Sequence, residues 1–157
     1  PKMGVLFWCA SLIRAGTVSD LPAIVRMARE FWKDTIYDEP FCEESVEGMA
    51  TECMNQHLFV VLEIANKVVG FACGVKGGLL ANACVTSGSE VAWWVDESHR
   101  QGKNGVGLLI ALERAAKAQN IKYWNMVFMQ SSMPERIEQI YQKMGYNKSE
   151  VSYTKVL

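Results

Sequence analysis

Apolar positions recur at helical spacing in four parts of the chain, and each part carries start or stop signals typical of a helix. Asp20 with Pro22 resembles a helix start, and Gly145 resembles a helix end. We therefore expect helices over about 20–33, over about 43–56, for 12–14 residues after Gly107, and from Pro134 to Gly145.

Runs of β-branched and apolar residues alternate with these segments and predict strands. The expected strands cover Met3–Ile13, residues 58–64, 68–74, 89–95 and 121–128, and a closing strand at 151–157. Ala65–Lys67 is expected to form a short turn, and Gly77–Gly88 a loop. The order of elements predicts an α+β fold, and without repeats or a linker we expect one domain over residues 1–157.

Composition limits the class of protein. The chain has 157 residues, of which 50% are hydrophobic and 21% charged, which suits one folded domain rather than a disordered chain. No apolar run approaches the ~18 residues of a membrane span. Five cysteines without C-x-x-C spacing and two distant histidines predict no metal site. Buried thiols of this kind suit a reducing compartment, so we expect a cytoplasmic protein.

Charge is balanced in total, at a net −1, but is segregated along the chain. Residues 30–52 carry eight acidic side chains and one basic one, whereas residues 100–157 carry nine basic and four acidic ones. This pattern suits an anionic ligand in the C-terminal half and a cationic one near the N-terminal half. It lacks the strongly basic face of a nucleic-acid binder, so we expect no nucleic-acid partner.

A polar, glycine-bearing segment, Asp96–Gly107, lies between a predicted strand and a predicted helix. Phosphate groups bind readily at a helix N-terminus because its first N–H groups lack acceptors. Glycines allow close backbone approach, and Arg100 and Lys103 add positive charge. A plain strand–helix connection would use the same glycines. No Gly-Lys-Ser/Thr follows, which excludes a P-loop, and no acidic residue ends the next strand, which excludes a dinucleotide fold.

The order of motifs around this segment resembles the GNAT family of N-acetyltransferases. The matching features are a strand ending at Val95, the acidic Asp96-Glu97, Arg100, the glycines of residues 102–107, and Tyr141 followed by Gly145-Tyr146. The run Trp93–Arg100 is similar to small bacteriophage-encoded members. One departure is the loop length, since Arg100 lies two residues too early relative to Gly105 and Gly107.

This resemblance implies a mixed, mostly antiparallel sheet of about six to seven strands, flanked by about four helices. It implies an acetyl-CoA-dependent acyltransferase that moves the acetyl group to an amine by direct attack in a ternary complex. Glu90 would be the general base, and Tyr141 would act on the departing thiolate. The expected acetyl-CoA contacts are Trp93, Trp94, Val95, Arg100, Gly102, Lys103, Asn104, Gly105, Val106, Gly107 and Ser131.

The roles of the two catalytic candidates have structural alternatives. Alternation along the strand places Glu90, Ala92 and Trp94 on one face and the residues between them on the other, unless a bulge intervenes. Glu90 can therefore be an ordinary strand carboxylate. Tyr141 shares a helix face with Ile137 and Met144 and can simply pack there.

The acceptor is expected to be an amine on a small molecule or a peptide. Carboxylates and aromatic rings in residues 30–52 suit a cationic acceptor through charge pairing and cation–π contact, although a solvated acidic helix face has the same composition. The chain could also assemble as a homodimer. Two alternatives also stay open: a non-catalytic protein that binds acyl-CoA or a partner, and an enzyme using another acyl donor, such as aminoacyl-tRNA.

Overall fold

The apolar run near the middle of the chain forms an internal strand of a five-stranded sheet. This strand, β2 (Leu58–Ile64), lies antiparallel to β1 (Ser11–Ala15) and to β3 (Lys67–Leu79). On the far side of β3, the antiparallel β4 (Asn82–Val95) pairs with the short parallel β5 (Tyr123–Asn125). The strand order is β1-β2-β3-β4-β5.

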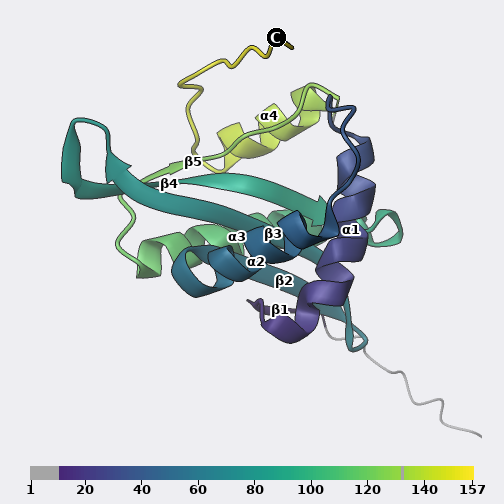
Figure 1. Cartoon of the computed structure of the whole chain (residues 1–157). Helices are drawn as coiled ribbons and strands as arrows, with labels where there is room; N and C mark the ends of the chain where they lie inside the picture. The colour runs from purple at the N-terminus through teal and green to yellow at the C-terminus, as the bar shows by residue number, and fades with distance from the viewer. Residues whose placement is uncertain (1–10, 132) are drawn as a thin grey trace, which may run out of the picture. The chain divides into compact units, whose positions relative to one another are not determined.

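Alternate side chains of β2 enter two separate cores, which explains its continuous apolar sequence. Leu58, Val60 and Leu62 pack in the core beneath α3 (Asn104–Ala118). Phe59 and Val61 pack in the core beneath α1 (Leu21–Lys33) and α2 (Glu43–Gln56). Helices therefore cover both faces of the sheet (Figure 1).

The structure is a computed structural model that describes residues 11–131 and 133–157. Contacts divide the chain after Val127 into two units. The first unit holds the sheet, α1–α3 and two short 3₁₀ helices, η1 (Val18–Asp20) and η2 (Glu97–His99). The second unit, residues 128–157, contains α4 (Pro134–Lys143). The prediction of one domain over residues 1–157 stays a prediction.

The α+β class, the four helices and the mostly antiparallel sheet are confirmed. The predicted turn at 65–67 is also present, with positive φ angles of 50° at Ala65 and 62° at Asn66. Among the residues that the structure describes, the strand count is lower than predicted, at five. Residues 151–157 form no strand, because no strand of the described chain pairs with them and the side chains of Tyr153 and Val156 are almost fully exposed.

Three predicted boundaries are wrong. The expected loop at 77–88 is strand backbone apart from the turn at 80–81, because β3 and β4 continue as a long hairpin. The strand predicted over 121–128 is the parallel strand β5, which spans only three residues because it pairs with β4 only at Ser87–Ser89. The third helix begins at Asn104, within the predicted glycine loop. Of the predicted first strand, residues 3–10 lie outside the described residues.

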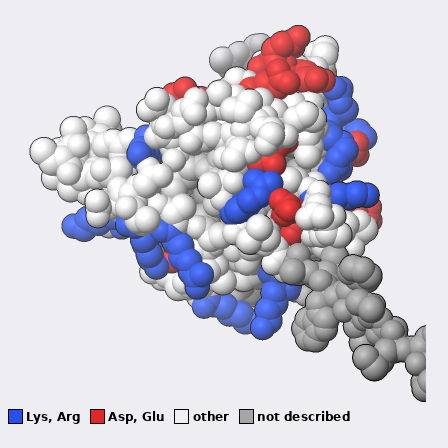
Figure 2. Space-filling model, turned by 90° about the horizontal axis from the view of Figure 1, so that it is seen from below, with Lys and Arg blue, Asp and Glu red and all other residues white. Residues whose placement is uncertain are grey.

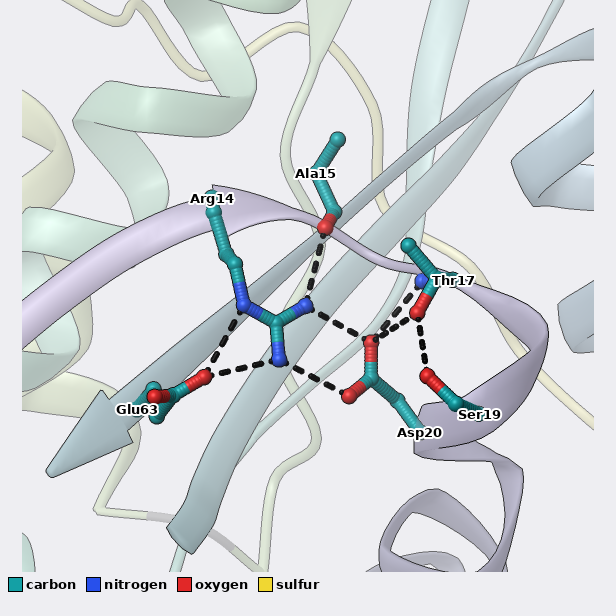
Figure 3. Close-up of polar contacts among 6 residues, drawn as sticks. All are labelled: Arg14, Ala15, Thr17, Ser19, Asp20 and Glu63. Atoms are coloured by element: carbon teal, nitrogen blue, oxygen red, sulfur yellow. Dashed lines mark hydrogen bonds and ion pairs between the residues drawn. The ribbon is translucent and has the colours of Figure 1, made fainter. Parts of the chain in front are cut away.

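A partly buried ion-pair network joins the start of α1 to the sheet (Figure 3). The Arg14 guanidinium donates to both carboxylate oxygens of Asp20, at 2.8 and 2.9 Å, and to Oε2 of Glu63, at 2.8 and 3.0 Å. Asp20 also accepts a hydrogen bond from the Thr17 backbone N–H at 2.8 Å. These bonds, led by the one from Arg14, hold the pKa of Asp20 below its usual value.

Within the described part of the chain, no helix combines the length and the apolar composition that crossing a membrane requires.

Candidate active site

The β4 and β5 strands pair over only three residues and then separate. The last pair is Ser89 with Asn125, whereas β4 continues to Val95. In the described chain, the β5-facing edge of residues 90–95 has no strand partner. We call the point of separation, residues 89–91 and 125–127, the fork.

Glu90 is the first residue of β4 beyond the last pair. Its side chain is 6% exposed, and its Oε2 accepts a hydrogen bond from the Val127 backbone N–H at 3.4 Å. Burial raises the pKa of Glu90 to about 8, while the Val127 N–H acts in the opposite direction. Glu90 is therefore largely protonated at neutral pH and gains its charge in mildly basic solution.

A β-bulge at Val91 sets the orientation of this strand. The ladder pairs Gly74 with Glu90 but Cys73 with Ala92, so Val91 is an extra residue in β4. This bulge is the interruption for which the predicted alternation made an exception, so alternation alone does not decide the face of Glu90. A bulge redirects the side chains on either side of it, and it leaves Val91 41% exposed beside the buried carboxyl.

The two tryptophans after the bulge pack in opposite cores. Trp93 packs toward α3, and Trp94 packs toward α1, where the Phe31 ring meets it edge-on at 6.1 Å between centroids. Both indole N–H groups are buried and, among the described residues, have no hydrogen-bond acceptor. Buried donors without acceptors are rare in proteins, so these two N–H groups are exceptions, one on each side of the end of β4.

Arg100 is held against the end of β4. Its Nε donates to the Val95 carbonyl oxygen at 2.8 Å, and its guanidinium lies 4.4 Å above the Trp94 ring. Val95 itself is buried in the core beneath α3. Arg100 therefore covers the strand end, and Lys103 is the cation nearest in sequence to the first turn of α3.

The segment between β4 and α3 is anchored at both ends. Asp96 donates its backbone N–H to Val69 O at 2.8 Å and binds Arg26 through both carboxylate oxygens, at 2.7 and 3.0 Å. The Asn104 side-chain amide donates to the His99 carbonyl at 2.9 Å. These contacts fix where the first turn of α3 begins.

The first turn of α3 has the features of an anion site. Its first N–H groups, at Asn104, Gly105 and Val106, precede the helical hydrogen bond that Gly107 donates to Lys103 O at 2.8 Å. This turn contains no acidic residue. Gly102 has a φ of +74°, and a Cβ placed on it would meet no atom within 4 Å. An anion's oxygens can therefore approach these donors from the side of Gly102.

Gly105 and Gly107 are helical residues whose missing side chains serve packing. A Cβ on Gly105 would lie 2.9 Å from Cζ2 of Trp93, and one on Gly107 would lie 3.0 Å from Cδ1 of Ile13. The two glycines therefore let α3 approach β4 and β1 closely. This role differs from the predicted one, in which they form a loop around a phosphate.

The remaining predicted site residues, Ser131 and Tyr141, lie in the second unit. Ser131 is exposed in a turn. Tyr141 is buried in α4, and its ring contacts those of Phe128 and Tyr146 at centroid distances of 6.1 and 5.8 Å. The Tyr146 N–H donates to Tyr141 O at 3.0 Å and Gly145 has a φ of +91°, so the predicted helix end is confirmed.

Sequence reasoning missed two participants in the site. Val127 supplies the N–H that contacts Glu90, and Arg26 holds Asp96 from α1. The contacts span 37 and 70 residues of sequence. A backbone amide and a surface-type arginine carry no local motif, so only the fold could identify them.

A protein-family model described as the acetyltransferase (GNAT) family matches residues 24–146 of the chain. This range contains the fork, the loop, α3 and Tyr141. A search of the curated proteins finds no significant match.

Several solved structures share the fold. A transcriptional regulator from Bacillus halodurans is 16% identical, with a TM-score of 0.75 over 94% of this chain and 100% of its own. A predicted acetyltransferase with acetyl-CoA from Clostridium acetobutylicum is also 16% identical, with a TM-score of 0.72 over 94% and 96%. An aminoglycoside acetyltransferase from an uncultured soil metagenomic sample is 14% identical, with a TM-score of 0.70 over 94% and 96%. At these identities the likeness is one of fold.

Proposed function

Because the chain belongs to the acetyltransferase (GNAT) family, we propose that it transfers an acetyl group from acetyl-CoA to a primary amine. The observation that carries this proposal is the buried Glu90 carboxyl at the fork, with its raised pKa, inside the region matched by the family model. A carboxylate with a pKa near the working pH suits a general base.

Three groups of the chain would divide the work. Bound acetyl-CoA supplies an activated thioester, which the amine attacks directly to form an amide and release the thiol. Glu90 takes up the proton that the attacking nitrogen loses, directly or through water. An N–H of Trp94 or Val95 on the open edge of β4 donates to the oxygen that gains negative charge. Tyr141 donates its hydroxyl proton to the departing sulfur and regains a proton from solvent.

The first turn of α3 is proposed to hold the diphosphate of the coenzyme. Its N–H groups, the open approach at Gly102 and the charge of Lys103 fit an anion of this kind. Trp93, Trp94 and Val95 would then line the path from the diphosphate to the fork. Arg100 would join this site only by leaving the Trp94 ring, and Ser131 is proposed as a further contact of the coenzyme.

The acceptor is proposed to be cationic. The acidic stretch carries eight carboxylates and one lysine, and basic side chains pair with two of these carboxylates: Lys33 binds Glu30, and Arg29 binds Glu43. In the same stretch the rings of Trp32 and Tyr37 stack at 5.6 Å. Carboxylates and stacked rings together favour a protonated amine.

The central test measures acetyl-CoA binding and thiol release separately. Acetyl-CoA at a concentration of about 100 times its Kd should stabilise the folded protein by about 2.7 kcal/mol, which a thermal-shift assay detects. Thiol release is then screened across polyamines, amino acids, aminoglycosides and lysine peptides. Stabilisation without thiol release for any amine would favour the non-catalytic alternative, and no stabilisation at all would contradict the proposal.

The substitution Lys103→Glu tests the diphosphate site. We expect it to weaken acetyl-CoA binding roughly three- to tenfold, because a negative charge at the helix N-terminus repels the anion. Calorimetry gives the affinity. The matched control is Lys117→Glu at the other end of α3, which should leave the affinity unchanged. Equal affinities for the wild type and Lys103→Glu would place the diphosphate elsewhere.

The substitution Tyr141→Phe tests the leaving-group role. We expect kcat to fall by roughly 10²-fold while acetyl-CoA binding changes little, because only the hydroxyl is lost and the ring still packs. Tyr146→Phe is the matched control, since its ring contacts Tyr141 in the same unit. A Tyr141→Phe enzyme with wild-type kcat would leave Tyr141 a packing residue.

A further inference from the structure

Two positions beside Glu90, one on β3 and one on β4, carry no side chain. Gly74 is the ladder partner of Glu90, and Gly88 lies two residues before it on β4. Partners directly opposite in an antiparallel ladder share a face of the sheet, as do alternate residues of one strand. The bulge at Val91 comes after Glu90, so this rule holds for all three residues. Glu90 and the two glycines therefore form a row on one face, in which Glu90 alone has a side chain.

The ring of Trp124, in β5, fills the space above both glycines. A Cβ on Gly88 would lie 2.6 Å from Cζ3 of this ring, and one on Gly74 would collide with its Cη2. Trp124 pairs with Gly88 in the parallel ladder and packs against the core beneath α3. Its Nε1 donates to Sδ of Met126 at 3.0 Å. The ring is therefore held in place above the two residues that adjoin Glu90 in the row.

We infer that Trp124 is a positioning residue for Glu90: its ring, seated on Gly74 and Gly88, keeps water from the carboxyl and holds it in its buried place at the fork. The inference deepens the proposed role of Glu90 as general base and rests on it. Glycines cannot fill the row themselves, so without the ring the space beside the carboxyl opens to water. A carboxyl covered by an apolar ring favours its protonated form, because water no longer stabilises the charge.

The cover is the influence on Glu90 that a substitution at position 124 changes. Burial raises the pKa of Glu90, the Val127 N–H opposes it, and no charged side chain of the described chain is among the causes. Cys73, which precedes Gly74 on β3, has a neutral thiol, because its hydrogen bond with Cys53 and its burial raise its pKa well above the usual range. Loss of the ring should therefore lower the pKa of Glu90.

The first experiment measures the pKa of Glu90 in the free protein, so it needs neither acetyl-CoA nor turnover. Glutamate labelled with carbon-13 at its carboxyl group is incorporated, and the Glu90 signal is the one missing from the spectrum of Glu90→Gln. Among the described residues Glu90 and Asp20 are the buried carboxyl groups, whereas Figure 2 shows exposed carboxylates as red patches on the surface. We expect the wild-type Glu90 signal to titrate with a pKa of about 8.

Two substitutions of Trp124 separate the cover from the fold. In Trp124→Ala the pKa of Glu90 should fall by roughly one pH unit or more, toward its ordinary value of 4.5, because water reaches the carboxyl. Trp124→Phe should keep a pKa near that of the wild type, because a phenyl ring still covers the glycines. The rise of kcat/KM with pH should move with the measured pKa, which a residue that only stabilises the fold would not cause. Circular dichroism checks folding, and Trp124→Leu, with the same expected direction, replaces an alanine variant that does not fold.

Matched controls test the ring from its other side and test the core in general. Gly88→Ala displaces the ring and should also lower the pKa of Glu90, whereas a Cβ on Gly77 of the same hairpin would meet no atom within 4 Å, so Gly77→Ala should not. Leu62→Ala truncates a buried side chain of the same core, opposite Gly70 on β3, and should leave the pKa of Glu90 near 8.

The outcomes distinguish this inference from the proposed function. A wild-type pKa near 4.5 would contradict both, because the raised pKa of Glu90 carries the proposal of a general base. A wild-type pKa of about 8 that stays unchanged in Trp124→Ala and in Gly88→Ala would overturn the inference alone and leave Glu90 as the base. An equal fall in Trp124→Ala and in Leu62→Ala would also overturn it, since any loosening of the core would then have the same effect.

Discussion

Replacing Glu90 with glutamine is expected to lower kcat by roughly 10²–10⁴-fold, because the variant lacks the group that takes up the proton of the attacking amine. Acetyl-CoA binding should persist, since the amide has nearly the same shape as the buried carboxyl. The measurement is steady-state thiol release, with calorimetry for binding. Glu97→Gln is the matched control, an exposed carboxylate of η2 that should retain activity. A Glu90→Gln enzyme as active as the wild type would exclude Glu90 as the general base.

The same carboxyl predicts the pH dependence of activity. With a pKa of about 8, the deprotonated form of Glu90 grows as pH rises toward 8 and dominates above it. The kcat/KM of the wild type should therefore climb through neutral pH and level off above about 8, whereas the residual activity of Glu90→Gln should lack this rise. A wild-type profile that is flat between pH 6 and 9, or falls there, would contradict the assignment.

Stability should vary with pH in the opposite sense. The folded-state pKa of Glu90 lies above the ordinary value of 4.5, so the folded protein binds the extra proton and is destabilised as pH rises from about 4.5 through about 8. The full shift corresponds to a loss on the order of 5 kcal/mol. Denaturant titrations should show Glu90→Gln more stable than the wild type above pH 8, and the difference should vanish near pH 4.

Replacing Arg14 with methionine is expected to destabilise the fold by about 3 kcal/mol. The substitution keeps most of the side-chain volume but leaves the buried Asp20 carboxylate without its cation. Urea titration gives the loss. Arg29→Met removes an exposed pair with Glu43 and should cost at most about 1 kcal/mol. Equal losses for the two variants would show that the network of Figure 3 contributes no more than a surface pair.

The Arg14 effect should also depend on pH, with a sign opposite to that of Glu90. The pKa of Asp20 is lowered in the folded state, so the stabilisation is present above the ordinary value of 3.8 and is lost as pH falls below it. The gap between the wild type and Arg14→Met should therefore narrow in acid. The double variant Arg14→Met/Asp20→Asn should recover part of the loss at neutral pH, because no unpaired charge remains buried.

Local chemistry explains which elements were predictable. Helical spacing and Pro22 defined α1, and the continuous apolar run defined β2 because both of its faces are buried. The positive φ angles at Ala65 and Gly145 occur at the predicted turn and helix end. Each of these features depends on residues within a few positions of one another, which a sequence pattern can report.

Strand lengths were not predictable, because they depend on a partner. Residues 151–157 alternate like a strand but have no adjacent ladder, whereas residues 77–85 look like a loop and yet extend the β3–β4 hairpin. Gly105 and Gly107 looked like loop glycines, but a side chain at either position would collide with a strand residue, Trp93 of β4 or Ile13 of β1. Contacts across long sequence separations decided each case.

By itself, the sequence determined the α+β class, the order of most elements and the motifs that resemble the acetyltransferase family. All of these follow from local patterns. Only the tertiary structure decided the environment of Glu90. The bulge at Val91, the end of the β5 ladder and the Val127 amide together bury its carboxyl and raise its pKa. Burial depends on atoms brought together from distant parts of the chain, and no residue at or beside position 90 encodes it alone.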